Sequence, residues 1–169
     1  MASSAHLKLI KQGTDIWNQE RDKDRDLTPD LTWASLSKAN LSGANLSKAN
    51  LRGAFLRGVV LSKADLTEAN LMGTNLNEAD LSDAILAGAN LTRANLIGTN
   101  LESANLANAI LTEADLSNAH LKGVDLTNTK NLTVKQLSSV ETLLEAKIDS
   151  DILQQIKERY PQLLKGNET

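Results

Sequence analysis

Residues 39–53 read ANLSG-ANLSK-ANLRG, and this five-residue unit decides the fold. Leu recurs at every fifth position from Leu31 to Leu126, twenty times without an exception. A small residue, most often Ala, stands two positions before each Leu, and Asn or Asp usually stands directly before it. The two residues after Leu are mostly Ser, Thr, Gly, Lys, Arg or Glu. Repetition at a fixed period therefore takes precedence over any local secondary-structure pattern.

A period of five residues is incompatible with a regular helix or strand. In an α-helix five residues advance about 140° beyond a full turn, so the Leu row would spread around the axis. In a strand an odd step places successive Leu side chains on opposite faces. A chain that turns a corner every five residues places each Leu and each small residue inside. We therefore expect an all-β solenoid whose coils stack through backbone hydrogen bonds at about 4.8 Å spacing.

Units such as residues 39–43 (ANLSG) and 64–68 (ADLTE) resemble the A(D/N)LXX repeat of the pentapeptide-repeat family. The resemblance extends from Leu31 to Asn128. It implies a right-handed quadrilateral β-helix with four pentapeptides per coil. On that basis the repeat makes about five coils. The number four comes from the resemblance, because the five-residue period alone does not give it.

The repeat boundaries divide the chain into three parts. Residues 1–30 are expected to be an N-terminal helical cap and linker, residues 31–128 the β-helix, and residues 129–169 a C-terminal helical cap. The flanks are similar to those of cyanobacterial members, in Trp17-Asn18 upstream of the repeat and in the tail from Leu132 to Pro161. Caps are needed because the open ends of a solenoid expose strand edges and core residues.

Apolar residues at helical spacing predict an N-terminal helix over about residues 4–21, which Gly13 weakens. Trp17 is expected to pack in this cap, and its alternative role is an anchor for a partner. At the other end Thr133 is expected to be the N-cap of a short helix over about 134–140. A second helix is expected over about 149–159, ended by Pro161. Its alternative role is an amphipathic partner-binding helix.

Composition excludes several classes of function. Net charge is −3, too mild to indicate a nucleic-acid or membrane partner. The chain has no Cys, which rules out disulfides and thiolate chemistry. No apolar run is long enough for a secretory signal or a membrane span. We therefore expect a cytoplasmic protein.

We expect no catalytic, cofactor or metal site. His6 and His120 are the two histidines, at opposite ends of the chain, and carboxylates such as Asp65 occupy outward positions. Catalysis needs a nucleophile, a base and an orienting group in one pocket, and a core tiled with Leu and Ala leaves no cavity. Metal binding needs several converging oxygens, which a flat wall does not provide. The chain is expected not to be an enzyme and to have no small-molecule substrate.

Four units carry an apolar residue where Asn or Asp usually precedes Leu: Phe55, Val60, Ile85 and Ile110. Phe55 and Val60 are consecutive units with Arg52 and Arg57 nearby. Aromatic residues and Arg are enriched at binding hot spots, so Arg52, Phe55, Arg57 and Val60 form the candidate partner patch. The alternative interpretation is a corner substitution without function. Val60, Ile85 and Ile110 are 25 residues apart, so with twenty residues per coil each would lie in the next coil and on the next face around the solenoid.

Charge is unevenly distributed along the repeat. Between Leu31 and Ala64 there are five basic residues and no acid, whereas residues 65–125 carry a net charge of −7. Such asymmetry can orient an association. We interpret the chain as a non-enzymatic structural or protein-interaction module with an unidentified protein partner, no direct nucleic-acid contact, and a slight preference for the monomer. The alternative, implied by the resemblance, is a DNA mimic acting on a topoisomerase such as gyrase.

Overall fold

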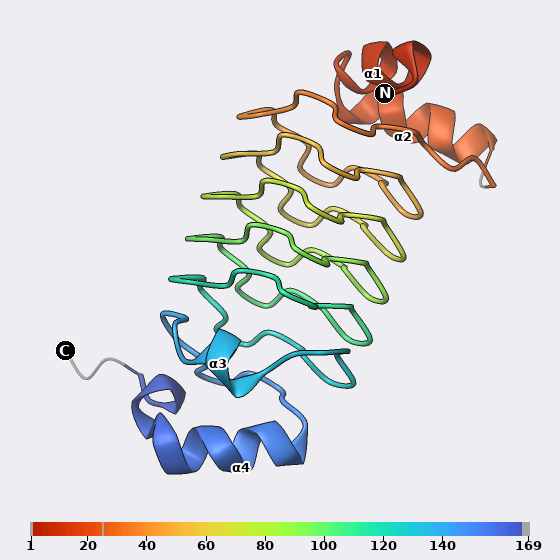
Figure 1. Cartoon of the computed structure of the whole chain (residues 1–169). Coiled ribbons are helices and arrows are strands. Elements are labelled where there is room, and N and C mark those ends of the chain that lie inside the picture. The colour runs from red at the N-terminus through yellow and green to blue at the C-terminus, as the bar shows by residue number, and fades with distance from the viewer. Residues whose placement is uncertain (1, 25, 167–169) are drawn as a thin grey trace.

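The computed structural model describes residues 2–24 and 26–166. A stack of coils fills the middle of the molecule and helices lie at both ends (Figure 1). The helices are α1 (Ser4–Ile10), α2 (Thr14–Lys23), α3 (Val134–Leu137) and α4 (Ser150–Arg159), and α4 is followed by the 3-10 helix η1 (Pro161–Leu164). Within the described ranges, none of these helices has the length and apolar character that crossing a membrane requires.

The coils are joined by parallel β-bridges with a constant offset. From Asp30–Asn50 to Ile110–Lys130, each bridge joins a residue to the one twenty positions further along the chain. One coil therefore contains four pentapeptides, and the stack has four faces. We name each face by its first bridging residue: Asp30 begins the first face, Ser35 the second, Asn40 the third and Asn45 the fourth.

In a repeat unit with Asn or Asp before Leu, the backbone N–H groups have acceptors, as residues 50–54 show. Asn50 donates to the preceding coil and Leu51 to the following one, each over 2.8 Å, and Gly53 donates to the following coil over 2.9 Å. Ala54 closes the corner by donating to the carbonyl of Leu51 over 2.9 Å. The amide of Arg52 donates to Oδ1 of Asn50 over 3.2 Å. This last contact explains why Asn or Asp precedes Leu, because these side chains readily accept from the amide two residues on.

The second residue after each Leu has a positive φ, between 55° and 68°, in all twenty units. Glycine adopts this left-handed conformation without strain, whereas other residues carry a cost of about 1–2 kcal/mol. Seven units have Gly at this corner, and the others include Lys48, Glu68 and Arg93. The conformation is therefore imposed by the stack and not by the residue at the corner.

The predicted inward positions are confirmed. The twenty Leu side chains of the repeat are buried, and so are the small residues two positions before them, with Ala39 in the first coil only partly buried. Two of these small positions hold threonine, whose hydroxyls donate to backbone carbonyls: Thr74 to Leu71 over 2.7 Å and Thr99 to Leu76 over 2.8 Å. A polar residue is tolerated there because its hydroxyl has an acceptor inside the core.

Val60, Ile85 and Ile110 lie on the third, fourth and first faces, as their bridges to Asp80, Asn105 and Lys130 show. The predicted step of one face per coil is confirmed, and these three side chains do not form a continuous apolar strip.

The single N-terminal helix predicted over residues 4–21 is wrong. Gly13 has φ 113°, outside the helical region, and separates α1 from α2. Trp17 on α2 has 0% of its surface exposed, so the prediction that it packs in the cap is confirmed, and its alternative role as a partner anchor is wrong.

Side chains of α2 substitute for a missing coil along the fourth face. The indole N–H of Trp17 donates to the carbonyl of Asn45 over 2.8 Å, and Oδ1 of Asn18 accepts from the amide of Asn45 over 2.8 Å. Arg21 donates to the carbonyl of Ser47 over 3.0 Å and to the carbonyl of Leu27. Arg21 is only 2% exposed, and this burial lowers the pKa of its guanidinium. The fourth face of the first coil is therefore closed by side-chain hydrogen bonds.

The first face is closed in the same way by α1 and the residues before it. The amide of Ser3 donates to the carbonyl of Asp30 over 3.0 Å. The amide of Asp30 donates to Nδ1 of His6 over 3.0 Å. His6 therefore has a capping role in the structure.

At the C-terminal end α3 takes the position of a second-face strand. After α3, the two residues joined by a bridge are 22 positions apart, as in His120–Thr142 and Asp125–Lys147, because the helix adds two residues to the coil. Thr133 is the N-cap, as predicted, and forms a reciprocal capping box with Gln136. The helix ends at Leu137, three residues before the predicted boundary.

The second C-terminal helix, α4, begins one residue later than predicted. Ile156 on α4 and Leu163 on η1 are buried. This part of the apolar side of the segment therefore packs against the end of the solenoid.

Candidate interaction surface

The N-terminal end of the second face carries the two most exposed aromatic side chains of the described chain. Trp33 is 56% exposed and Phe55 is 50% exposed. Phe55 occupies the bridging position between Ser35 and Asn75, where most other units have Asn or Asp. Trp33 occupies the left-handed corner just before Ser35, with φ 60°. Large apolar groups held in water on a rigid wall are typical of binding sites.

The position of the Trp33 ring depends on Gly53 in the next coil. A Cβ at Gly53 would lie 2.4 Å from two carbons of the indole ring, closer than any non-bonded contact allows. The absence of a side chain therefore lets the ring rest directly on the backbone of the next coil. Residues 33 and 53 belong to the same corner column because twenty residues separate them.

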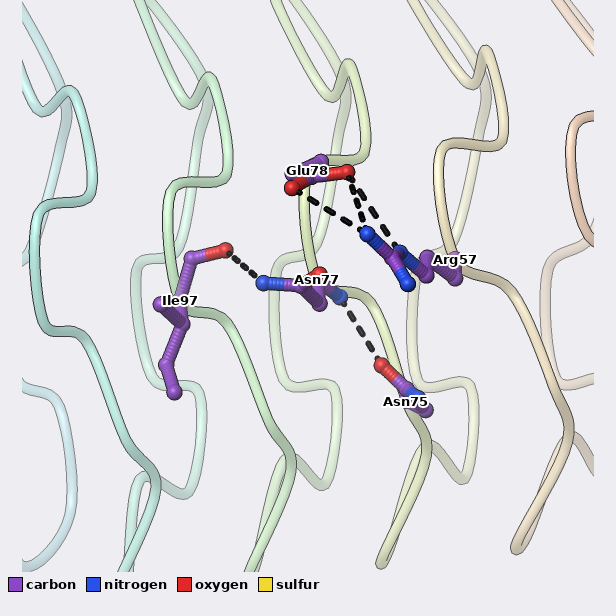
Figure 2. A network of polar contacts seen from close by, with 5 residues as sticks. All are labelled: Arg57, Asn75, Asn77, Glu78 and Ile97. Carbon is purple, nitrogen blue, oxygen red and sulfur yellow. Dashed lines mark hydrogen bonds and ion pairs between the residues drawn. The ribbon is translucent and has the colours of Figure 1, made fainter.

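Arg52 and Arg57 lie at the two corners that flank Phe55, and both are exposed. Arg57 forms an ion pair with Glu78 in the following coil over 3.2 Å. Figure 2 shows this pair beside Asn77, whose side-chain amide donates to the carbonyl of Ile97 over 3.0 Å. These contacts link three successive coils along one corner. An exposed pair of this kind is worth about 0–1 kcal/mol, so it does not prevent Arg57 from binding another anion.

The structure brings together three of the four residues of the predicted patch. Arg52, Phe55 and Arg57 lie on the second face and its corners, whereas Val60 lies around the next corner on the third face and is half-buried. Trp33 was missed by sequence reasoning. The signal was present, because a bulky corner residue twenty positions before a glycine must lie over it, but it becomes visible only once the coil length is known. We call Trp33, Arg52, Phe55 and Arg57 the second-face patch.

A shallow depression of about 200 Å³ adjoins this patch at the corner between the first and second faces. Its lining residues are Trp33, Arg52, Gly53, Met72, Gly73 and Arg93. Arg93 donates to Glu113 over 2.6 Å, and this hydrogen bond raises the pKa of Arg93 and lowers that of Glu113. The depression thus combines an aromatic wall with cationic groups.

A larger groove of about 530 Å³ lies at the opposite end of the second face, beside α3. It exists because α3 replaces the strand that would have paired with Asp115. Polar side chains such as Glu113, Asp115 and Lys135 line it. Across residues 2–24 and 26–166, no three His, Cys, Asp or Glu side chains are grouped so as to hold a metal ion.

His120 lies on the third face, far from His6 in the N-terminal cap. Its Nδ1 is 2.8 Å from a carboxylate oxygen of Glu141, and 41% of its side chain is exposed. The predicted outward position of His120 is therefore confirmed.

Several solved structures are similar to this chain. The pentapeptide repeat protein Rfr23 from the cyanobacterium Cyanothece 51142 is 39% identical, with a TM-score of 0.49. That match covers 66% of this chain and 65% of Rfr23, so the chain spans just under two thirds of the Rfr23 length. A pentapeptide repeat protein from the Arabidopsis thaliana thylakoid lumen is 22% identical over 73% of this chain and 74% of that one, with a TM-score of 0.46. QnrB1, a plasmid-mediated fluoroquinolone resistance protein, is 18% identical over 82% of this chain and 88% of that one, with a TM-score of 0.38.

Comparison with curated proteins returned no match. The family described as pentapeptide repeats matches in 8 copies, over residues 30–62, 64–102 and 89–128. These ranges cover more than half of the chain and coincide with the bridged coils. The chain therefore belongs to the pentapeptide-repeat family.

Proposed function

We propose that this protein is a non-enzymatic interaction module whose second-face patch binds a partner protein. The observation that carries the proposal is the exposure of Trp33 and Phe55 beside Arg52 and Arg57 on one wall. Buried aromatic and arginine anchors supply most of the binding energy in protein interfaces. The molecule has no other pair of exposed aromatics among its described residues.

In this proposal the scaffold is the right-handed, quadrilateral β-helix of about five coils that the family resemblance implies, with helices at both ends. Its backbone amides are hydrogen-bonded within and between coils, so the patch is held in place before a partner arrives. Preorganisation of this kind reduces the entropy lost on binding.

The proposal is tested by capture of partners from a lysate of the native host, with the tagged protein and two kinds of variant. Trp33→Ala and Phe55→Ala remove the aromatic anchors, and each is expected to weaken binding by more than 2 kcal/mol, roughly thirtyfold. Ile85→Ala is the matched control, because Ile85 is exposed at the same repeat position on the fourth face. Capture that is equal for all three variants would remove the second-face patch from consideration.

A second candidate function rests on the acidic part of the repeat, residues 65–125, with its net charge of −7. An acidic rod is a feature of DNA mimics. In this second candidate function, the protein is a DNA mimic that inhibits or protects a topoisomerase such as gyrase. Supercoiling by gyrase should then be altered by the protein. Unchanged supercoiling in the presence of excess protein excludes this role.

A further inference from the structure

The N-terminal cap closes only part of the first coil. The hydrogen bonds that the cap makes with the first coil lie on the first and fourth faces or at the corners beside the fourth face. The cap residues that donate or accept in them are Ser3, His6, Trp17, Asn18 and Arg21. In Figure 1, α1 and α2 are gathered over one side of the first coil. The second face therefore begins without a covering element.

Comparison with the next coil shows which groups are left open there. In the second coil the amide of Phe55 donates to Ala34 over 2.9 Å, and the carbonyls of Phe55 and Arg57 accept from Leu36 and Lys38 over 3.0 and 2.9 Å. The corresponding groups of the first coil are the amide of Ser35 and the carbonyls of Ser35 and Ser37. Among the hydrogen bonds of the described residues, none reaches these three groups from the N-terminal side. Both serines are exposed, so this is an accessible parallel strand edge.

The two corners of this edge carry an aromatic and a cationic side chain. Trp33 lies at one corner over Gly53. Lys38 lies at the other, with its Cγ 3.7 Å from the position of a Cβ at Gly58, so that its stem rests on the next coil and its ammonium is free to face solvent. Arg52 and Arg57 follow in the second coil, and no acid occurs between Leu31 and Ala64. The surroundings of the edge therefore favour an anionic occupant.

We propose that this second-face edge, defined by Ser35 and Ser37, accepts an extended acidic segment of a partner protein as an added β-strand. The inference rests on the proposed function and specifies its partner. The backbone of the segment pairs with the open amide and carbonyls, and its outward carboxylates lie beside Lys38 and the arginines of the patch. Only a peptide backbone supplies donors and acceptors alternating at strand spacing.

Two other occupants fit the observations less well. A second copy of the chain, paired edge to edge, would bring the cationic residues of the two edges together without opposing acids. Single-stranded nucleic acid would stack on Trp33 and Phe55, but it has no backbone donor for the carbonyls of Ser35 and Ser37.

The test uses amide hydrogen exchange of the full chain, resolved by NMR. The probe is an acetylated and amidated peptide of alternating Glu and Val. The Ser35 amide should exchange rapidly in the free protein and slow by about an order of magnitude or more when the probe is added. The same peptide N-methylated at every residue is the control, because it keeps the charge and the side chains but has no backbone N–H left to pair with a strand edge.

The charge requirement is tested with a pair of variants. Lys38→Glu should abolish the protection of Ser35 by the probe. Lys48→Glu should retain it, since Lys48 occupies an equivalent left-handed corner next to the capped fourth face.

Three outcomes overturn the inference. If the N-methylated peptide binds as tightly as the probe, the surface is an electrostatic patch and not a strand acceptor. If Ser35 is protected in the free protein and this protection depends on protein concentration, the occupant is a second copy. If oligothymidylate protects the edge and the acidic peptide does not, the occupant is nucleic acid. In the first case the proposed function still stands, provided that Trp33→Ala and Phe55→Ala reduce partner capture.

Discussion

Asn and Asp before each core Leu have a precise structural role. Their Oδ1 accepts from the amide two residues further on, from Asp30 to Asp125 and in every unit that has Asn or Asp at this position. The preference for Asn or Asp at the position before each core Leu was evident from the sequence. Its cause was not, because it requires the corner geometry, in which this amide is the only one without a backbone acceptor.

The Asp residues at the position before a core Leu make the free energy of unfolding depend on pH. Asp125 accepts from the hydroxyl and the amide of Thr127 over 2.7 and 3.0 Å, and these hydrogen bonds, with a smaller contribution from Lys147, lower its pKa. A carboxyl group whose pKa is lower in the folded than in the unfolded state stabilises the fold at pH values above its unfolded pKa of about 3.9. This stabilisation is lost as the pH falls through the folded-state pKa.

Asp125→Asn should reduce this dependence, because Asn keeps the acceptor and does not titrate. We expect the free energy of unfolding of the variant, measured with urea, to fall less than that of the wild type between about pH 5 and pH 2. Asn105→Asp, at the same position one coil earlier, should have the opposite effect. Identical pH profiles for all three proteins would contradict the assignment.

Gly53 and Gly73 form a natural pair for testing the support beneath Trp33. Both have φ 65°, but a Cβ at Gly73 meets no atom within 4 Å, whereas one at Gly53 collides with the indole ring. Gly73→Ala should cost about 1–2 kcal/mol for the left-handed backbone alone. Gly53→Ala should carry the same cost and also displace Trp33.

The displacement is measured by fluorescence in a Trp17→Phe background, where Trp33 is the one remaining tryptophan. Gly53→Ala should lower the fluorescence anisotropy and increase quenching by acrylamide, and Gly73→Ala should leave both unchanged. Equal changes in the two variants would show that the ring does not rest on Gly53.

At the scale of elements, the caps were predictable in kind but not in detail. The spacing of apolar residues indicated that Trp17 belongs to a helix. Because this spacing carries no information on the backbone φ of Gly13, the break between the two helices was missed. The donors from Trp17 and Arg21 to fourth-face carbonyls could not be predicted either, because they depend on how α2 lies across the first coil. Thr133 as N-cap was predictable, since the Thr-x-x-Gln pattern is local.

Gln136 connects α3 to the last complete coil. Its Oε1 accepts from the amide of Thr133, and its Nε2 donates to the carbonyls of Leu111 and Ala114 over 2.8 and 2.9 Å. Gln136→Glu keeps the capping acceptor, removes both donors and places a carboxylate against two carbonyls. The free energy of unfolding in urea should fall by about 1–3 kcal/mol.

Gln154→Glu is the control for this change, because Gln154 is exposed on α4 and its substitution should stay within about 0.5 kcal/mol of the wild type. If the two variants are equally stable, Gln136 does not hold α3 to the solenoid.

At the scale of the whole molecule, each coil contacts mainly its neighbours, so stability is distributed along the stack. The ion pairs of the repeat follow the same rule: Arg93–Glu113 and Lys122–Glu102 each join residues twenty apart. The Leu row predicted a solenoid from the sequence. The coil length needed the family resemblance, and without it neither the ion pairs nor the position of Trp33 over Gly53 could be derived from the sequence.

Leu76→Ala tests the coupling between the two ends. Leu76 is fully buried in a central coil, and its truncation should cost about 2–5 kcal/mol. Because the damaged coil lies between two intact parts, urea unfolding should also become less cooperative, with a smaller dependence on denaturant concentration. Val140→Ala, at the C-terminal end of the molecule, should lower stability without this loss of cooperativity. A single transition of unchanged steepness for Leu76→Ala would show that the stack unfolds as one unit.

The constant offset of twenty residues has a consequence for how such a chain can change its length. Adding or removing five residues keeps every Leu in the core, yet it rotates one end of the rod by a quarter turn relative to the other. The second-face patch and the groove beside α3 would then point in different directions. Adding or removing twenty residues changes only the distance between them, so a partner that touches both ends would tolerate whole coils gained or lost and reject single pentapeptides.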